Sequence, residues 1–231
     1  MRVDQQFRRK SSPISLMKGD DPEQPLVIIV DDDASVREAL SELLLSVGFQ
    51  ASGFASTREL LAAGVLDRHG CLILDVRMPG ASGLDLQHHL VESGNSKPII
   101  FLSGHGDIPM TVQAMKAGAI DFLTKPVRDQ TLLDAVMSGI KRDLAQRASA
   151  LATKRNLELL ETLSQRERQI LSEVSGGRVN KQIAFDLGIS EATVKLHRSN
   201  IMRKMQAASI GEVIRIWESL PASVREARAE V

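Results

Sequence analysis

Five polar residues follow short apolar runs and together could carry out phosphoryl chemistry. Asp31 and Asp32 come directly after one such run, and Asp75 closes another. Ser103 and Lys125 follow two further runs. A carboxylate can act as a nucleophile toward phosphorus, while a hydroxyl and an ammonium can pair with phosphoryl oxygens. These residue types are the ones that transfer of a phosphoryl group to an aspartate requires.

Such a site would also bind a cation, because neighbouring carboxylates repel one another unless a positive charge lies between them. Mg²⁺ suits oxygen ligands, and we expect Asp31, Asp32, Asp75 and the backbone carbonyl of Arg77 to hold it. Each aspartate alone has an ordinary alternative: the Asp31–Asp33 run could simply cap the helix that follows. The joint occurrence of these residue types at the ends of different apolar runs favours the phosphoryl site.

The elements that must position these residues alternate between strands and helices. Strands that are apolar throughout indicate a parallel sheet covered on both faces, so we predict an α/β fold with a doubly wound, flavodoxin-like, five-stranded sheet of order 2-1-3-4-5. Strands one and three are neighbours in that order, which brings the aspartates together. The predicted strands are Leu26–Val30, Gln50–Phe54, Cys71–Leu74, Pro98–Leu102 and Ala119–Leu123. The predicted helices are Ser35–Val47, Ser56–Ala63, Leu84–Ser93, Pro109–Ala117 and one from Asp129. A cis bond between Lys125 and Pro126 could aim the lysine inward.

Residues 141–162 are predicted to form a charged linker helix that contains neither Gly nor Pro. Ile140, Leu144, Ala148 and Leu151 recur at spacings of three or four residues, as one face of a helix would. This face is either solvated or paired with the same helix of a second copy, and the sequence leaves both open.

Residues 163–231 are predicted to form a second, smaller, all-α helix-turn-helix domain. Ser164-Gln165-Arg166-Glu167 is a capping box that begins its first helix. Gly188 is the expected C-cap of the following short helix, and Ser190 the N-cap of the next. The later helices are predicted at Asn180–Leu187, Glu191–Met205 and from Ser209 to about Ser219.

The second helix of this helix-turn-helix is rich in cations, which can neutralise DNA phosphates while the helix lies in the major groove. A cationic helix alone is more often only a solvated surface, so the charge by itself does not decide the function. The cations are Lys195, His197, Arg198, Arg203 and Lys204. The face expected to be exposed toward DNA carries Thr193, Lys195, His197 and Asn200.

Composition supports two domains with different partners. The 231 residues carry no net charge, yet residues 26–140 hold 8 Lys and Arg against 14 Asp and Glu, while residues 164–231 hold 11 against 8. Residues 1–25 are polar and are predicted to be a disordered tail, with Met17 as an alternative start. The single cysteine, Cys71, is expected to be buried and inert. No apolar segment long enough for a membrane span or a secretory signal occurs, so a cytoplasmic protein without membrane contact is expected.

Residues 26–140 resemble a response-regulator receiver domain. The resemblance is carried by Val30-Asp31-Asp32, Leu74-Asp75-Val76-Arg77-Met78-Pro79-Gly80, Ser103-Gly104-His105-Gly106-Asp107 and Lys116-Ala117-Gly118-Ala119-Ile120-Asp121-Phe122-Leu123-Thr124-Lys125-Pro126, and spans residues 26–140. It implies that Asp75 accepts a phosphoryl group from a sensor histidine kinase and that Asp31 and Asp32 hold Mg²⁺. It also implies that Ser103 and Lys125 report the modification and that Phe122 swings inward. Alternatively, the Phe122 ring stays buried in its strand whether or not Asp75 is phosphorylated.

The C-terminal part resembles the LuxR-type output domain, and the combination is similar to the NarL/FixJ class. The resemblance is carried by Leu163–Glu167, Asn180–Ala184 and Ile189–Ile201. It places Lys195, His197 and Arg198 at the DNA surface and Lys181 near the DNA backbone. One departure is Val179, which stands where a Ser or Thr is common, so a cap or phosphate contact is in doubt.

Together these features predict a transcription factor that is activated by phosphorylation of Asp75, dimerises and binds double-stranded promoter DNA. The resemblance extends to regulators of nodulation genes in rhizobia, and it makes an activator that contacts RNA polymerase the expected role. No enzyme activity beyond slow self-dephosphorylation is expected. The alternatives are a phosphorelay adaptor that binds protein instead of DNA, and an aspartyl-phosphate phosphatase. The phosphatase is disfavoured because Arg77 stands where a second carboxylate would be needed.

Overall fold

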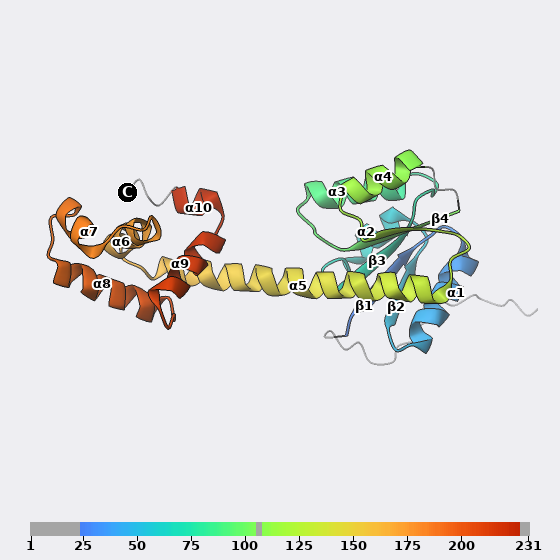
Figure 1. Ribbon diagram of the computed structural model, residues 1–231. Helices are drawn as coiled ribbons and strands as arrows, with labels where there is room; N and C mark the ends of the chain where they lie inside the picture. Colours follow the sequence, from blue (N-terminus) through green and yellow to red (C-terminus); the bar gives the residue numbers. More distant parts are fainter. Residues whose placement is uncertain (1–23, 105–107, 227–231) are drawn as a thin grey trace, which may run out of the picture. The chain divides into compact units, whose positions relative to one another are not determined.

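The fold is described from a computed structural model, over residues 24–104 and 108–226 (Figure 1). The predicted tail, with its alternative start at Met17, lies outside the described residues except for positions 24 and 25, and so does the His105-Gly106-Asp107 part of the receiver motif. The chain divides into two compact units, one ending at Asp143 and the other beginning at Leu144. No helix among the described residues is long and apolar enough to cross a membrane.

The first unit is built on a five-stranded, all-parallel sheet of order β2-β1-β3-β4-β5, which confirms the predicted fold class and strand order. All residues of β1 and β3 are buried, as expected for central strands covered on both faces. The strands are β1 (Leu26–Val30), β2 (Gln50–Phe54), β3 (Gly70–Asp75), β4 (Ile99–Ser103) and β5 (Asp121–Thr124).

Helices cover both faces of this sheet, because successive strand residues point to opposite sides. Leu72 and its same-side neighbours pack under α2, α3 and α4, whereas Ile73 and its neighbours pack under α1 and α5. Figure 1 shows these helices around the strands. The helices are α1 (Ala34–Ser46), α2 (Thr57–Ala63), α3 (Gly83–Glu92), α4 (Ile108–Lys116) and α5 (Asp129–Glu161).

Strand β5 begins two residues later than predicted. The amide of Ala119 bonds the carbonyl of Ala114, and Gly118, with a φ of 92°, bonds that of Met115. These bonds close the end of α4, so Ala119 belongs to the helix terminus and cannot pair in the sheet. The apolar run that predicted a strand here is therefore split between two structural roles.

The second unit is all helical, as predicted. Its core includes Leu160 from the last turn of α5, which is completely buried, and Leu157 packs beside it. The further helices are α6 (Gln165–Ser175), α7 (Asn180–Asp186), α8 (Glu191–Lys204), α9 (Ile210–Ser219) and α10 (Ala222–Glu226).

Three details of this part differ from the sequence-based expectations. The segment predicted as a separate linker helix is part of α5, which runs without a break from Asp129 to Glu161. Leu187 is the C-cap of α7, and Gly188 follows it with a φ of 63°. Helix α10, directly after Pro221, was not expected from the sequence, because five residues are too few to show a helical period.

Candidate functional site

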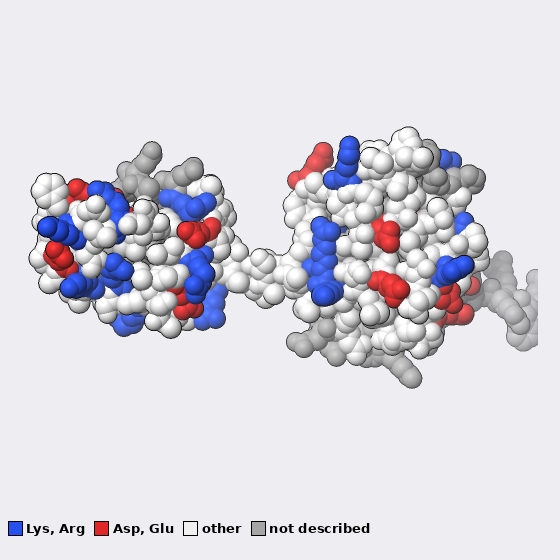
Figure 2. All heavy atoms as spheres, in the orientation of Figure 1, with Lys and Arg blue, Asp and Glu red and all other residues white. Residues whose placement is uncertain are grey.

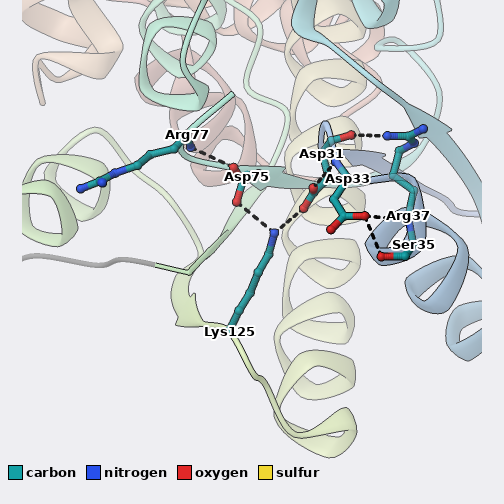
Figure 3. Close-up of polar contacts among 7 residues, drawn as sticks. All are labelled: Asp31, Asp33, Ser35, Arg37, Asp75, Arg77 and Lys125. Carbon is teal, nitrogen blue, oxygen red and sulfur yellow. Dashed lines mark hydrogen bonds and ion pairs between the residues drawn. The ribbon is translucent and has the colours of Figure 1, made fainter. Parts of the chain in front are cut away.

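Asp31, Asp75 and Lys125 meet at the carboxyl end of the sheet (Figure 3). Val30 is paired with Leu74 across β1 and β3, so Asp31 and Asp75 each follow that pair by one residue. The Nζ atom of Lys125 lies 2.5 Å from Oδ2 of Asp31 and 3.1 Å from Oδ1 of Asp75. One ammonium therefore bridges two carboxylates, and both carboxylates are nearly inaccessible to solvent.

Hydrogen bonds show which aspartate of the Asp31–Asp33 run caps α1 and which one points toward the site. Asp33 is the N-cap of α1: its side chain accepts from the amide and hydroxyl of Ser35. Asp31 points toward the site, and its carboxylate accepts from the amide of Asp33. Asp32 is exposed. The helix-capping alternative thus applies to Asp33, while the predicted convergence holds for Asp31 and Asp75.

Further hydrogen bonds hold the Asp75 carboxylate and the main chain of Asp31 in place. The amide of Arg77 donates to Oδ2 of Asp75 at 2.9 Å. The guanidinium of Arg37, from α1, donates to the carbonyl of Asp31 at 2.6 Å. Figure 3 shows the side chain of Arg77 pointing away from the two aspartates. Arg77 therefore contacts the site through its backbone amide, whereas the predicted role of its carbonyl as a metal ligand stays a prediction. Arg37 is a support that no sequence pattern had indicated.

Ser103 and Phe122 lie on the neighbouring strands β4 and β5. Ser103 is buried, and its carbonyl accepts from the amide of Lys125 at 2.8 Å. The Lys125–Pro126 bond is cis, as expected. The ring of Phe122 is half-buried against the core, with its centroid 5.9 Å from that of Phe101.

Burial and charge act in opposite directions at this site. Burial raises the pKa of the Asp75 carboxyl, and the hydrogen bond and charge of Lys125, which lower it, do not fully compensate. Burial alone would lower the pKa of Lys125, but its bonds to Asp31 and Asp75 raise it overall. Lys125 is thus held as an ammonium between two carboxylates.

The oxygen donors of Asp31 and Asp75 are of the kind that a small divalent cation prefers. Lys125 supplies the compensating charge between them. Within residues 24–104 and 108–226, no three His, Cys, Asp or Glu side chains are grouped so as to hold a metal ion. The oxygen donors of Asp31 and Asp75 fit Mg²⁺ by their chemistry, but the third predicted carboxylate, Asp32, is exposed and does not join the other two.

In the C-terminal unit, the predicted cations differ in what they contact. Lys181, Lys195 and Arg203 are exposed. In Figure 2, Lys and Arg side chains lie along the edge of this unit that α8 forms in Figure 1. Asn200 is half-buried, and Nδ1 of His197 is buried without a hydrogen-bond partner among the described residues.

Two of the other predicted DNA contacts, Thr193 and Arg198, also make hydrogen bonds within the domain. Thr193 shares a hydroxyl–hydroxyl bond of 2.8 Å with Ser190, the N-cap of α8. Arg198 donates to Oδ1 of Asn180 at 2.5 Å and so links α8 to α7. The Arg198–Asn180 bond fixes the two helices of the helix-turn-helix relative to each other, while the Thr193–Ser190 bond stabilises the start of α8.

Lys204, the last residue of α8, donates to the buried carboxylate of Glu167 at 2.6 Å and to the carbonyl of Thr162 at 3.1 Å. Glu167 was identified from the sequence only as a capping-box residue. That role is confirmed, since its carboxylate also accepts from the amide of Ser164. A pairing across 37 residues leaves no local pattern in the sequence, and neither does the contact between Arg198 and Asn180.

Comparisons with known proteins agree with this arrangement. Residues 27–137 match the family described as response regulator receiver domain, and residues 161–217 match the luxR family of bacterial regulatory proteins. The chain is 50% identical to Nodulation protein W of Bradyrhizobium diazoefficiens over 199 residues, which cover 86% of this chain and 87% of that protein. The chain belongs to the NarL/FixJ family of response regulators.

Solved structures of this family resemble the chain along most of its length. The response regulator StyR has 46% identity and a TM-score of 0.73, with 84% of this chain and 98% of that chain covered. Full-length FixJ from B. japonicum has 36% identity and a TM-score of 0.52, with 84% and 96% covered. The NarL/FixJ member described here is a transcription regulator with a receiver domain and a LuxR-type DNA-binding domain.

Proposed function

We propose that a sensor histidine kinase phosphorylates Asp75 and that this switches the regulator into a homodimer that binds promoter DNA. The observation that carries the proposal is the buried Asp75 carboxylate, held by Lys125 at the same edge of the sheet as Asp31. A nucleophile, a cation and an acidic neighbour thus meet in one shielded place, which phosphoryl transfer to aspartate requires.

In the proposed reaction, a carboxylate oxygen of Asp75 attacks the phosphorus of a phosphohistidine. A P–O bond forms, the P–N bond breaks, and the leaving imidazole keeps the electron pair and takes up a proton. The amide of Arg77 holds the other oxygen of Asp75. Lys125, released from part of its pairing, would meet a phosphoryl oxygen.

Mg²⁺ is the cation expected in this site. Asp31, Asp75 and the carbonyl of Arg77 would hold it, and Asp32, whose side chain is exposed in this structure, would join them only after turning toward the site. When bound, Mg²⁺ neutralises charge on the transferring phosphoryl group. The existing contact of Lys125 with both Asp31 and Asp75 shows that a positive charge is already accommodated between them.

Ser103 and Lys125 are the proposed reporters of the modification, and Phe122 is proposed to move with them. Phosphorylation adds about −1.5 to −2 charges at Asp75, and a hydroxyl donor such as Ser103 can move toward the new oxygens. The bond between the Ser103 carbonyl and the Lys125 amide joins the two reporters directly. Phe122, which lies in the same strand as Thr124, starts half-buried against Phe101 and would move further inward.

DNA would be bound by α8 in the major groove. Lys195 and Arg203 are the exposed cations that this role needs, with Lys181 of α7 at the DNA backbone. Thr193, His197, Arg198, Asn200 and Lys204 complete the proposed interface. Arg198 and Lys204 would reach phosphates only by giving up or sharing their present partners.

The proposed targets are nodulation genes. The regulator is proposed to activate them and to contact RNA polymerase. The support for these targets is the 50% identity to a protein named Nodulation protein W. The alternative, an adaptor that binds only protein, would leave the exposed cations of α8 without a role.

The test uses the full chain with Mg²⁺ and acetyl phosphate as phosphodonor. Phosphate incorporation and affinity for promoter DNA are measured for the parent, for Asp75→Asn and for Asp134→Asn, which removes an exposed carboxylate on α5. We expect Asp134→Asn to behave like the parent and Asp75→Asn to lose both responses. An equal gain in DNA affinity for Asp75→Asn would overturn the proposal.

A further inference from the structure

The peptide groups on both sides of Asp32 are held by side chains. The guanidinium of Arg37 donates to the carbonyl of Asp31 at 2.6 Å, and this carbonyl belongs to the peptide that precedes Asp32. The carboxylate of Asp31 accepts from the amide of Asp33 at 3.0 Å, and this amide belongs to the peptide that follows Asp32. Because a peptide group is planar, each bond restrains the orientation of the whole group. The backbone of Asp32 is therefore held on both sides, while its side chain is exposed.

The main chain of Asp31 is tied to two elements of the fold. Its amide donates to the carbonyl of Phe54, the last residue of β2, at 3.2 Å. Its carbonyl is held by Arg37 of α1, and Figure 3 shows the guanidinium at this carbonyl. The carboxylate of Asp31, which meets Lys125, is thus carried by a main chain that the sheet and a helix both hold.

The position of Arg37 suits this contact better than it suits helix formation. Arg37 is the fourth residue of α1, near the positive end of the helix dipole, where a cation is unfavourable. Its aliphatic part lies over Gly53 of β2: a Cβ at position 53 would lie 3.5 Å from both Cβ and Cδ of Arg37. The side chain is half-buried there. Its contact with β2 therefore directs the guanidinium toward Asp31.

We propose that Arg37 is a positioning residue for the cation site, which holds the Asp31–Asp33 run so that Asp32 can join Asp31 and Asp75 by turning its side chain alone. This inference rests on the proposed function, in which Mg²⁺ assists phosphoryl transfer to Asp75. A site whose backbone is already ordered loses less conformational entropy when it binds, and so binds more tightly. Without Arg37, cation binding must also order the peptide between Asp31 and Asp32.

The charge of Arg37 and its hydrogen bond act on a bound cation in opposite directions. The positive charge repels a divalent ion, so removing the charge alone would strengthen Mg²⁺ binding. Removing the hydrogen bond releases the carbonyl of Asp31 and would weaken Mg²⁺ binding. The sign of the change in affinity therefore separates a positioning role from an effect of charge.

The first test measures the Mg²⁺ dissociation constant of the unphosphorylated full chain by isothermal titration calorimetry. We expect Arg37→Met, which keeps an apolar stem but lacks the donor, to bind Mg²⁺ about tenfold more weakly than the parent. Arg37→Lys keeps the charge and a donor and should recover part of the loss. The matched control is Arg58→Met, which removes the same charge from an exposed position near the start of α2 and should not weaken binding. Circular dichroism verifies that each variant keeps its fold.

Three outcomes of this titration would overturn the inference. The first is an Arg37→Met variant that binds Mg²⁺ as tightly as the parent or more tightly, which would leave Arg37 a structural or purely electrostatic role. The second is an equal weakening by Arg58→Met. The third is a parent chain that binds no Mg²⁺.

The second test follows phosphate incorporation from acetyl phosphate as the Mg²⁺ concentration is varied. Arg37→Met should need about tenfold more Mg²⁺ for half of its maximal rate and should reach the parent's rate when Mg²⁺ is saturating. A reduced rate that added Mg²⁺ does not restore would contradict the positioning role. If the parent takes up no phosphate, the proposed function fails, and the calorimetric comparison still judges Arg37 by itself.

Discussion

Lys204, the last residue of α8, forms an ion pair with Glu167, the buried capping-box residue at the start of α6, at an Nζ–Oε2 distance of 2.6 Å. One carboxylate therefore completes a helix N-terminus and anchors the far end of the helix proposed to lie in the DNA groove. Lys204 was expected from the sequence to touch DNA. Its observed contact gives it a positioning role in the folded domain, whether or not it also reaches a phosphate.

We predict that Lys204→Met destabilises the C-terminal domain by about 1–3 kcal/mol, because it leaves the buried Glu167 carboxylate without its cation. Arg203→Met is the control, since Arg203 is the preceding residue and is exposed. Urea unfolding followed by fluorescence of Trp217, which belongs to this core, measures both. Equal stabilities for the two variants would show that the ion pair contributes nothing to folding.

Glu167 also makes the stability of this domain depend on pH. Burial alone would raise the pKa of Glu167, but hydrogen bonds from Lys204 and from Ser164 outweigh it and lower the pKa. The group therefore binds a proton less readily in the folded than in the unfolded chain. Its stabilisation is complete above the ordinary glutamate pKa of about 4.3 and is lost as the pH falls through the lower folded value.

Glu167→Gln should accordingly be less stable than the parent at neutral pH, and this difference should shrink as the pH is lowered below about 4.3. Unfolding curves at a series of pH values measure this difference. Glu173→Gln removes a more exposed carboxylate on the same helix and serves as control. A constant difference between Glu167→Gln and the parent over the acid range would contradict the pKa direction.

The sequence predicted best those features that a few neighbouring residues determine. Strands β1 and β2 were predicted to the residue, because short runs between turn signals define them. The approach of Asp31 and Asp75 followed from the strand order, because β1 and β3 are neighbours. Lys125 follows β5, which pairs with neither strand, and its approach depends also on the cis Lys125–Pro126 bond. Which aspartate of the run caps α1 was not predictable, since Asp32 and Asp33 have identical chemistry and only the backbone geometry at Ser35 selects Asp33.

The second domain begins earlier in the chain than the sequence predicted, and Leu160 shows this. The second domain was predicted to begin at residue 163, but Leu160 is completely buried in its core. We predict that Leu160→Ala destabilises this domain by about 2–5 kcal/mol, because a cavity is left in a closely packed core. Leu151→Ala, on the exposed face of the same helix, should change stability by less than about 0.5 kcal/mol.

Two fragments test the same boundary without a substitution. A fragment of residues 163–231 lacks Leu160 and the carbonyl of Thr162, which accepts from Lys204. A fragment of residues 153–231 retains both. The longer fragment should unfold at a higher urea concentration, and equal midpoints would show that α5 contributes nothing to this domain.

Lys195 gives the most direct test of how α8 meets DNA. It is exposed and lies in the N-terminal half of the helix, the half that enters the groove in helix-turn-helix proteins. If Lys195 pairs with a phosphate, Lys195→Ala should weaken binding to all sequences alike and reduce the slope of log affinity against log salt by about 1. If it reads a base edge, affinity should fall mainly for the specific site. Glu191→Ala, at the first position of the same helix, should instead leave the slope unchanged or strengthen binding, because it removes a negative charge near the DNA. A Lys195→Ala variant with the parent's affinity and salt slope would mean that α8 does not present this face to DNA.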